Sequence, residues 1–160
     1  MIFLSVGTLF PFDRLVRAVD SAVGKRLIED EVFAQIGHGG FEPRNMEYVE
    51  TLDKEAFDEK VGCAVCVISH AGMGSIIAAL SRNKPLLVMP RMKRFGEHVN
   101  DHQVDIAKKF EEYGHLLVAR DVADLPDVID KLRNFVPKER SAAPRAVADR
   151  ISRFLSGVKS

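Results

Sequence analysis

Short apolar runs alternate with segments of helical periodicity along most of this chain. Runs of four to six residues bounded by glycine, proline or polar residues are typical of strands. The most apolar of them suit the interior of a parallel sheet, where both faces are buried. The predicted strands lie at 2–6, 32–36, 46–50, 64–69, 86–89 and 115–119.

Apolar residues between these runs recur at intervals of three and four, as they do on one face of a helix. The first series extends from Phe12 to Val23, and Gly24 can terminate its helix. A more polar segment at 53–60 is also expected to be helical. The remaining helices are predicted from Ile76, Ile77, Ala79 and Leu80; from Val99, Ile106, Ala107 and Phe110; from Leu125, Val128, Ile129 and Leu132; and from Val147, Ile151, Phe154 and Leu155, with Pro144 near the start of the last.

Strands that alternate with helices imply right-handed crossovers, which predicts an α/β fold with a doubly wound, mostly parallel, Rossmann-like sheet. No repeat or long linker divides the chain, so we expect residues 1–160 to form a single domain. Ligands of such sheets bind beyond the carboxyl ends of the strands. The loops expected at this edge are 7–11, 70–75 and 91–103.

The charge of the chain is balanced, with 23 acidic and 23 basic residues. This balance argues against nucleic acid as a partner bound through bulk charge. No apolar run approaches the roughly 20 residues that span a bilayer. Residues 1–14 lack the basic region and cleavage site of a signal peptide, so we expect a cytoplasmic protein.

Cys63 and Cys66 have the spacing of a redox or zinc motif but lie in the apolar run CAVCVIS. On a strand, residues three apart face opposite sides, and no second cysteine pair completes a zinc site. His98 and His102 likewise lack a third ligand. We therefore interpret both cysteines as core residues and expect neither a metal nor a cofactor.

The segment SHAGMGS, residues 69–75, follows a predicted strand and opens a predicted helix. Gly72 and Gly74 allow a tight turn and a close approach of the backbone to a ligand, and the free N–H groups of a helix start favour a diphosphate. A plain strand-to-helix turn is the alternative. The dinucleotide fingerprint is absent because Ile77 stands where it needs a small residue, and the Gly-Lys-Ser/Thr of a P-loop is absent too.

A second polar segment, PRMKRFGEHVNDHQ, spans residues 90–103. Its amide, imidazole and carboxylate groups suit sugar hydroxyls, and its basic residues, including Arg91, suit phosphate or a uronic acid. A solvated loop before a well-capped helix is the alternative. His70 and His38 lie at the same expected edge, where either a structural or a functional role is open.

Four segments together, VGTLFPFDRLVRAVD, SHAGMGS with its helix, KPLLVMPR and GEHVNDHQ, resemble the C-terminal domain of family 28 glycosyltransferases. The chain looks like the small subunit of two-part bacterial exopolysaccharide transferases. It is also similar to the catalytic subunit of the two-part N-acetylglucosamine transferase of N-glycan assembly and, more distantly, to the donor half of the peptidoglycan enzyme that makes lipid II. The resemblance implies the C-terminal, donor-binding half of a GT-B glycosyltransferase.

The resemblance also implies roles for particular residues. The glycine turn would hold the diphosphate of a UDP-sugar, the segment at 100–103 would approach the sugar, and the first-strand loop would face the interdomain cleft. Uracil contacts would fall near Tyr48 and Val49, and Ala78 replaces a glutamate that in many relatives can hold the ribose hydroxyls. The implied substrate-binding residues are Gly7, Thr8, Ala71, Gly72, Met73, Gly74, Ser75, Arg91, Asn100, Asp101, His102 and Gln103.

A chain that looks like only the donor half lacks an acceptor site and an obvious catalytic base. His70 is the candidate for that role, with Asp13 as another. We therefore expect a hexosyltransferase subunit that acts on a lipid-linked acceptor through a membrane-anchored partner, which recruits it to the inner face of the membrane. The partner would dock on the apolar edge VGTLFPF, residues 6–12, and on the basic loop 91–94, although packing of residues 10–12 on their own helix is the alternative. A non-catalytic nucleotide-sugar-binding or regulatory module is the other hypothesis for the chain.

Overall fold

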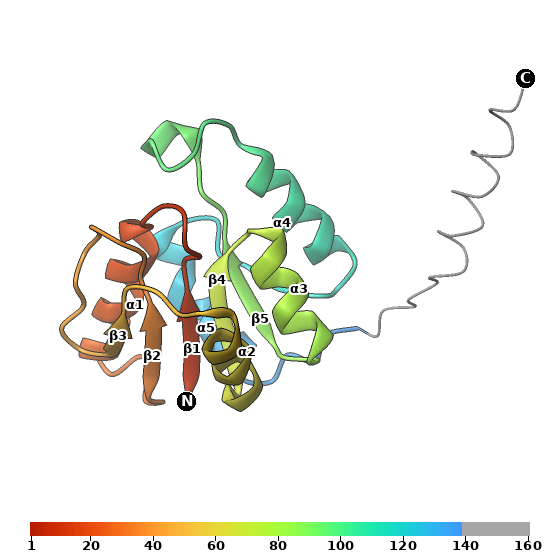
Figure 1. Cartoon of the computed structure of the whole chain (residues 1–160). Coiled ribbons are helices and arrows are strands. Elements are labelled where there is room, and N and C mark those ends of the chain that lie inside the picture. The colour runs from red at the N-terminus through yellow and green to blue at the C-terminus, as the bar shows by residue number, and fades with distance from the viewer. Residues whose placement is uncertain (139–160) are drawn as a thin grey trace, which may run out of the picture.

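The computed structural model describes residues 1–138, and the predicted helix around residues 147–155 lies outside this range. The described chain forms one six-stranded sheet in which every neighbouring pair is parallel, in the order β3-β2-β1-β4-β5-β6 (Figure 1). Its strands are β1 (Ile2–Ser5), β2 (Val32–Gln35), β3 (Glu47–Val49), β4 (Cys66–His70), β5 (Leu86–Met89) and β6 (Leu117–Val118). The predicted doubly wound α/β fold is confirmed.

Helices cover both faces of the sheet. Helices α1 and α5 share one apolar cluster with it, and α2, α3 and α4 share the cluster on the other face. Alternate residues of β1 serve both clusters, because Ile2 and Leu4 point to the first and Phe3 to the second. The helices are α1 (Asp13–Gly24), α2 (Lys54–Cys63), α3 (Met73–Ser81), α4 (His102–Glu112) and α5 (Leu125–Leu132), with 3-10 turns η1 (Lys93–Phe95) and η2 (Val122–Asp124).

Two predictions are wrong, the start of the helix that carries Val99 and the burial of Cys63. Val99 is 80% exposed and precedes α4, so it does not belong to the apolar face of that helix. Cys63 is exposed at the end of α2, and only Cys66 lies in β4 and is buried. Burial raises the pKa of the Cys66 thiol to about 11, which makes it an inert core residue.

The chain changes direction across the sheet between β1 and β4. After β1 it builds outward through β2 to β3, and it then returns to place β4 on the other side of β1. The loops that follow β1 and β4 therefore diverge at the carboxyl edge, the edge where the strands end, and leave a crevice between them. Within residues 1–138 no helix is long and apolar enough to cross a membrane.

Candidate functional site

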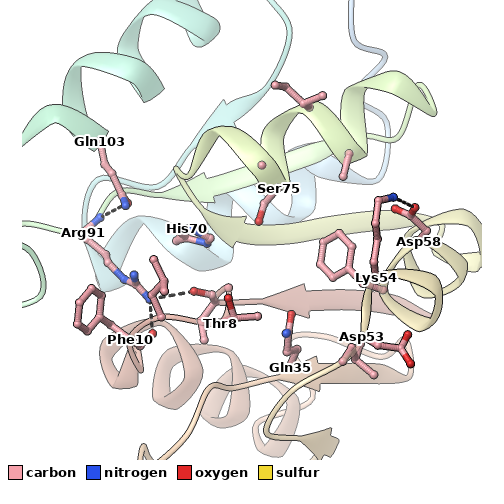
Figure 2. Close-up of a pocket in the computed structure, with 18 of the residues that line it drawn as sticks. Thr8, Phe10, Gln35, Asp53, Lys54, Asp58, His70, Ser75, Arg91 and Gln103 are labelled. Atoms are coloured by element: carbon pink, nitrogen blue, oxygen red, sulfur yellow. Dashed lines mark hydrogen bonds and ion pairs between the residues drawn. The ribbon is translucent and has the colours of Figure 1, made fainter.

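A cavity of about 820 Å³ opens at this crevice (Figure 2). Its walls come from the loop after β1, from the turn between β4 and α3, from α2, and from the segment after β5. Buried polar side chains lie beneath it: Ser5 donates to Gln35 Oε1 at 2.8 Å, and Ser69 donates to the Ser5 carbonyl at 2.8 Å. Gln35 lines the cavity itself. The cavity thus has a fixed polar floor where the two central strands end.

The glycine turn forms one wall, where the sequence predicted it. Gly72 is the N-cap of α3 in an extended conformation, and no side chain caps the helix. Gly74 and Ser75, in the first turn, line the cavity. A Cβ atom on Gly74 would meet no described atom within 4 Å, so the backbone there faces open space. First-turn amides have no partner inside their own helix, which makes this wall suitable for an anion.

The His70 ring lies between two glycines. A Cβ on Gly72 would stand 2.1 Å from His70 Nε2, and one on Gly7 would stand 2.9 Å from His70 Cε1. Gly7 also has a φ of +80°, a conformation that side chains other than glycine rarely adopt. A side chain at either position would therefore clash with the imidazole, so both glycines are needed whether or not a ligand binds.

His70 is neutral near pH 7. Burial, together with the neighbouring Arg91 guanidinium, lowers the pKa of His70 from 6.5 to about 4. Its Nδ1 lies 3.3 Å from Ser69 Oγ, whose own proton is donated to the Ser5 carbonyl. This arrangement assigns the ring proton to Nδ1 and leaves Nε2 as an acceptor on the side of Gly72. A base with so low a pKa is poorly matched to proton abstraction at neutral pH.

Arg91 is buried, with 3% exposure, although it belongs to the basic loop on which a partner was expected to dock. Its Nη2 donates to the carbonyls of Val6 at 2.9 Å and Phe10 at 2.5 Å, and its backbone N–H donates to Gln103 Oε1 at 3.1 Å. Its Nε is buried and has no hydrogen-bond partner among the described residues. Arg91 therefore ties the loop after β1 to the end of β5 and contributes a cationic group to the cavity wall.

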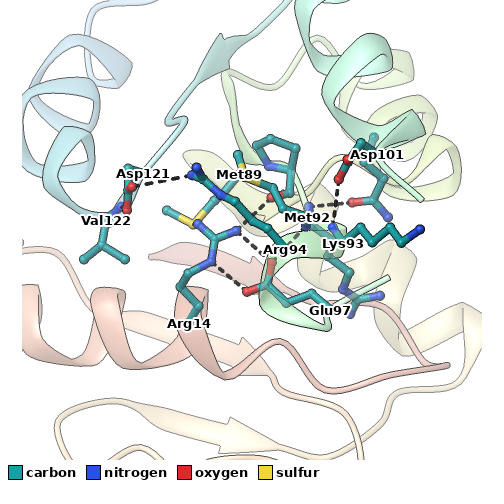
Figure 3. A network of polar contacts seen from close by, with 12 residues as sticks. Arg14, Met89, Met92, Lys93, Arg94, Glu97, Asp101, Asp121 and Val122 are labelled. Carbon is teal, nitrogen blue, oxygen red and sulfur yellow. Dashed lines mark hydrogen bonds and ion pairs between the residues drawn. The ribbon is translucent and has the colours of Figure 1, made fainter. Parts of the chain in front are cut away.

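A second arginine fixes the segment after β5 (Figure 3). Arg14 of α1 donates from Nε to Glu97 Oε1 at 2.7 Å and from Nη2 to Glu97 Oε2 at 2.8 Å. Its Nη2 also donates to the Pro90 carbonyl at 2.9 Å. Glu97 also accepts the backbone N–H of Met92 at 3.0 Å. Both side chains of the ion pair are nearly buried, at 13% and 12% exposure, so the segment is pinned against α1.

The segment at 100–103 enters the cavity only through Gln103, which is 4% exposed. Asn100, Asp101 and His102 are exposed and do not line the cavity. Asn100 Oδ1 accepts the His102 N–H at 3.3 Å, and Asp101 Oδ1 accepts the Lys93 N–H at 2.7 Å. These side chains make local contacts near the start of α4, but no side chain caps that helix.

The other predicted residues divide in the same way. Gly7 and Thr8 line the cavity, as does His98, for which the sequence gave no specific role. Other predicted residues do not line the cavity. Ala71 is buried, Met73 is 42% exposed, and Tyr48 and Val49 lie on β3. His38 pairs with Glu50, and Asp13 accepts the N–H of Phe41.

Sequence reasoning missed the wall formed by α2. Lys54, Phe57 and Asp58 face the cavity from this helix, and Ile77 and Arg82 face it from α3. In α2, Phe57 and Asp58 follow Lys54 by three and four residues, a spacing found in any solvated helix, so no local pattern distinguished them. Within residues 1–138 no group of three or more His, Cys, Asp or Glu side chains is arranged to hold a metal.

Comparisons with known proteins bear on the family and the fold of this chain. The human UDP-N-acetylglucosamine transferase subunit ALG13 is 35% identical over 124 residues, which are 72% of this chain and 10% of the human protein. The NMR solution structure of ALG13 superposes with a TM-score of 0.55 at 22% identity, covering 90% of this chain and 91% of that one. The crystal structure of Acinetobacter baumannii MurG gives a TM-score of 0.61 at 18% identity, covering 84% and 42%.

The chain thus spans only about a tenth of the human relative's length. The two solved structures are less than 25% identical to it and show the shared fold alone. The family model of the glycosyltransferase family 28 C-terminal domain matches residues 1–157, nearly the whole chain. The chain therefore belongs to the family of glycosyltransferase family 28 C-terminal domains.

Proposed function

We propose that this chain binds a UDP-sugar in the cavity at the carboxyl edge and acts as the donor-binding subunit of a hexosyltransferase. The observation that carries the proposal is the uncapped, open glycine turn at the N-terminus of α3, beside the point where the sheet changes direction. Amide groups there favour a diphosphate. The similarity to subunits named for UDP-N-acetylglucosamine transfer supports the nucleotide and the reaction class.

The cavity residues suggest an orientation for the donor. With the diphosphate at Gly74 and Ser75, the sugar would lie toward Arg91, His98 and Gln103. These groups offer hydrogen-bond donors and acceptors for hydroxyls together with one fixed positive charge. The nucleoside would then lie along α3 and α2.

His70 has a positioning role in this proposal rather than that of a catalytic base. Its neutral ring packs against Gly72 and Gly7, and so sets the shape of both loops that would meet the diphosphate. The attacking hydroxyl still needs a base. Asp13 is occupied by the N–H of Phe41 and lies outside the cavity. We propose that a second, membrane-anchored subunit supplies the base and the site for a lipid-linked acceptor, and holds this chain at the inner face of the membrane.

The rim of the cavity offers a docking surface for such a subunit. Leu9 is 83% exposed and Phe10 is 57% exposed in the loop after β1, and Phe95 and Val99 add further exposed apolar area in the segment after β5. Phe12 is buried and belongs to the core, so the packing alternative holds for that residue alone. Exposed apolar side chains rimmed by polar groups are typical of protein interfaces.

Calorimetric titration with UDP tests the proposal. Gly74→Asp places a negative charge in open space beside the proposed diphosphate, so UDP affinity should fall at least about tenfold, or 1.4 kcal/mol. Gly62→Asp is the matched control, because Gly62 also faces open space but lies outside the cavity. Unchanged affinity in Gly74→Asp would exclude this placement, and absence of UDP binding by the wild type would contradict the proposed function.

A further inference from the structure

One end of the cavity is bounded by two helices and carries fixed charges. On α3 and at its C-cap, the cavity-lining residues Ser75, Ala78 and Arg82 follow one another at spacings of three and four, on one side of the helix. At 1.5 Å per residue, Ala78 stands roughly 5 Å and Arg82 roughly 10 Å along the helix from the glycine turn. A nucleoside attached to a diphosphate at that turn would extend over this distance.

Asp58 of α2 faces this part of α3 (Figure 2). Its Oδ2 accepts from Lys54 Nζ at 2.6 Å, and its Oδ1 lies 3.3 Å from Arg82 Nη2. Arg82 Nη1 in turn donates to the Ala78 carbonyl at 3.3 Å. The carboxylate is therefore held in place across from Ala78 by one cation on each oxygen.

Asp58 still has acceptor capacity after these contacts. An ionised carboxylate offers about four lone-pair sites, of which the two cations occupy two. The hydrogen bond from Lys54 is the main cause that lowers the pKa of Asp58, so the group is ionised at neutral pH. Asp53 is the other acidic residue that lines the cavity within residues 1–138, and its side chain caps α2 by accepting the Ala56 N–H at 2.8 Å.

The space beside Asp58 suits a ribose. Ala78 contributes only a methyl group to the opposite wall, one helical turn from the glycine turn. Leu52 and Phe57 add apolar surface at the same end, which suits a nucleobase. A ribose attached through its 5′ oxygen to a phosphate at the turn would present its vicinal hydroxyls at this depth.

We propose that Asp58 accepts hydrogen bonds from the vicinal ribose hydroxyls of the donor nucleotide and so selects ribonucleotides over 2′-deoxyribonucleotides. The inference rests on the proposed function, because it needs a nucleoside diphosphate at the glycine turn. Lys54 and Arg82 are positioning residues that hold the carboxylate. A purely structural ion-pair cluster would stabilise α2 against α3 without any preference between the two kinds of nucleotide.

The test is a four-way comparison by calorimetry, with UDP and 2′-deoxy-UDP titrated into the wild type and Asp58→Asn. The wild type should bind UDP about tenfold more tightly than 2′-deoxy-UDP. Asp58→Asn should lose most of this preference through weaker binding of UDP, with little change for 2′-deoxy-UDP. Glu59→Gln is the matched control, because it removes the same charge from the next residue of α2, which is exposed and outside the cavity. It should keep the tenfold preference.

Two results would overturn the assignment. Equal affinities of the wild type for the two nucleotides would do so without any variant, even if Asp58→Asn failed to fold. An equal loss of affinity for both nucleotides in Asp58→Asn would identify a structural or general electrostatic role. Absence of binding of either nucleotide by the wild type is a separate outcome, which contradicts the proposed function itself.

Discussion

The enclosure of His70 makes Gly72→Ala an informative substitution. The added Cβ would lie 2.1 Å from His70 Nε2 and 2.8 Å from its Cδ2, whereas real Cβ atoms essentially never approach closer than 3.0 Å. Gly72 has a φ of −82°, which any residue adopts, so the cost comes from the clash and not from backbone strain. The imidazole has to move, and Gly7 blocks it on the other side.

The expected cost is that of overpacking a filled site, about 1–3 kcal/mol in the free energy of unfolding. For a chain of this size, 1 kcal/mol corresponds to a fall in Tm of roughly 2–4 °C. Urea denaturation followed by circular dichroism measures the free energy directly. Gly74→Ala is the matched control, because its methyl group would enter open space two residues further on. We expect its effect on stability to be below about 0.5 kcal/mol after the gain in helix propensity is allowed for.

The double variant Gly72→Ala/His70→Ala decides whether the imidazole is the cause. Removing the ring removes the group that the methyl clashes with, so the two changes together should cost at least about 1 kcal/mol less than the sum of the single changes. If the costs add, or if Gly72→Ala is no worse than Gly74→Ala, the described position of His70 between the two glycines is wrong.

Two further predictions concern pH and the partner. The pKa of His70 is lowered from 6.5 to about 4 in the folded state, so on acidification the unfolded state binds the proton first. The free energy of unfolding should therefore fall by about 2 kcal/mol between pH 7.5 and pH 5. His70→Gln should remove that part of the pH dependence measured by urea denaturation, and an unchanged slope would contradict a buried neutral ring. The purified chain should bind UDP but transfer sugar negligibly to a lipid-linked acceptor in a radiolabel assay, and should gain activity when co-expressed with a membrane-anchored acceptor subunit. Efficient transfer by the chain alone would refute the need for a partner.

Much of the fold follows from the sequence because parallel strands buried on both faces leave a strong signal. Runs such as LLVM at 86–89 are apolar at every position, and a glycine or proline near each end marks where the strand stops. The errors fall where that signal is weak. Val99 has the right spacing for α4, but the helix begins later, at His102. Cys63 follows the apolar pattern of β4, although α2 continues up to it.

The candidate site was predictable in part, for a physical reason. The glycine turn is built from adjacent residues, so its chemistry is visible in a short segment. The environment of Arg91 is not, because its partners Val6 and Phe10 lie more than 80 residues away and contribute only backbone carbonyls. The same is true of Asp58 and Arg82, because the residues beside them in the sequence give no sign that they face a cavity.

The central pairing of β1 with β4 has a consequence for how the cavity forms. The residues that line the cavity extend from Val6 to Gln103, and its two main loops meet only after the chain has closed this long-range pairing. A folding intermediate with local structure alone would contain no binding site, so the ligand should recognise the completed sheet and not its parts. A ligand that binds only the folded form raises the free energy of unfolding, by about 2.7 kcal/mol at a free concentration one hundred times Kd. A nucleotide bound as proposed would thereby make the stability of this chain depend on the nucleotide concentration.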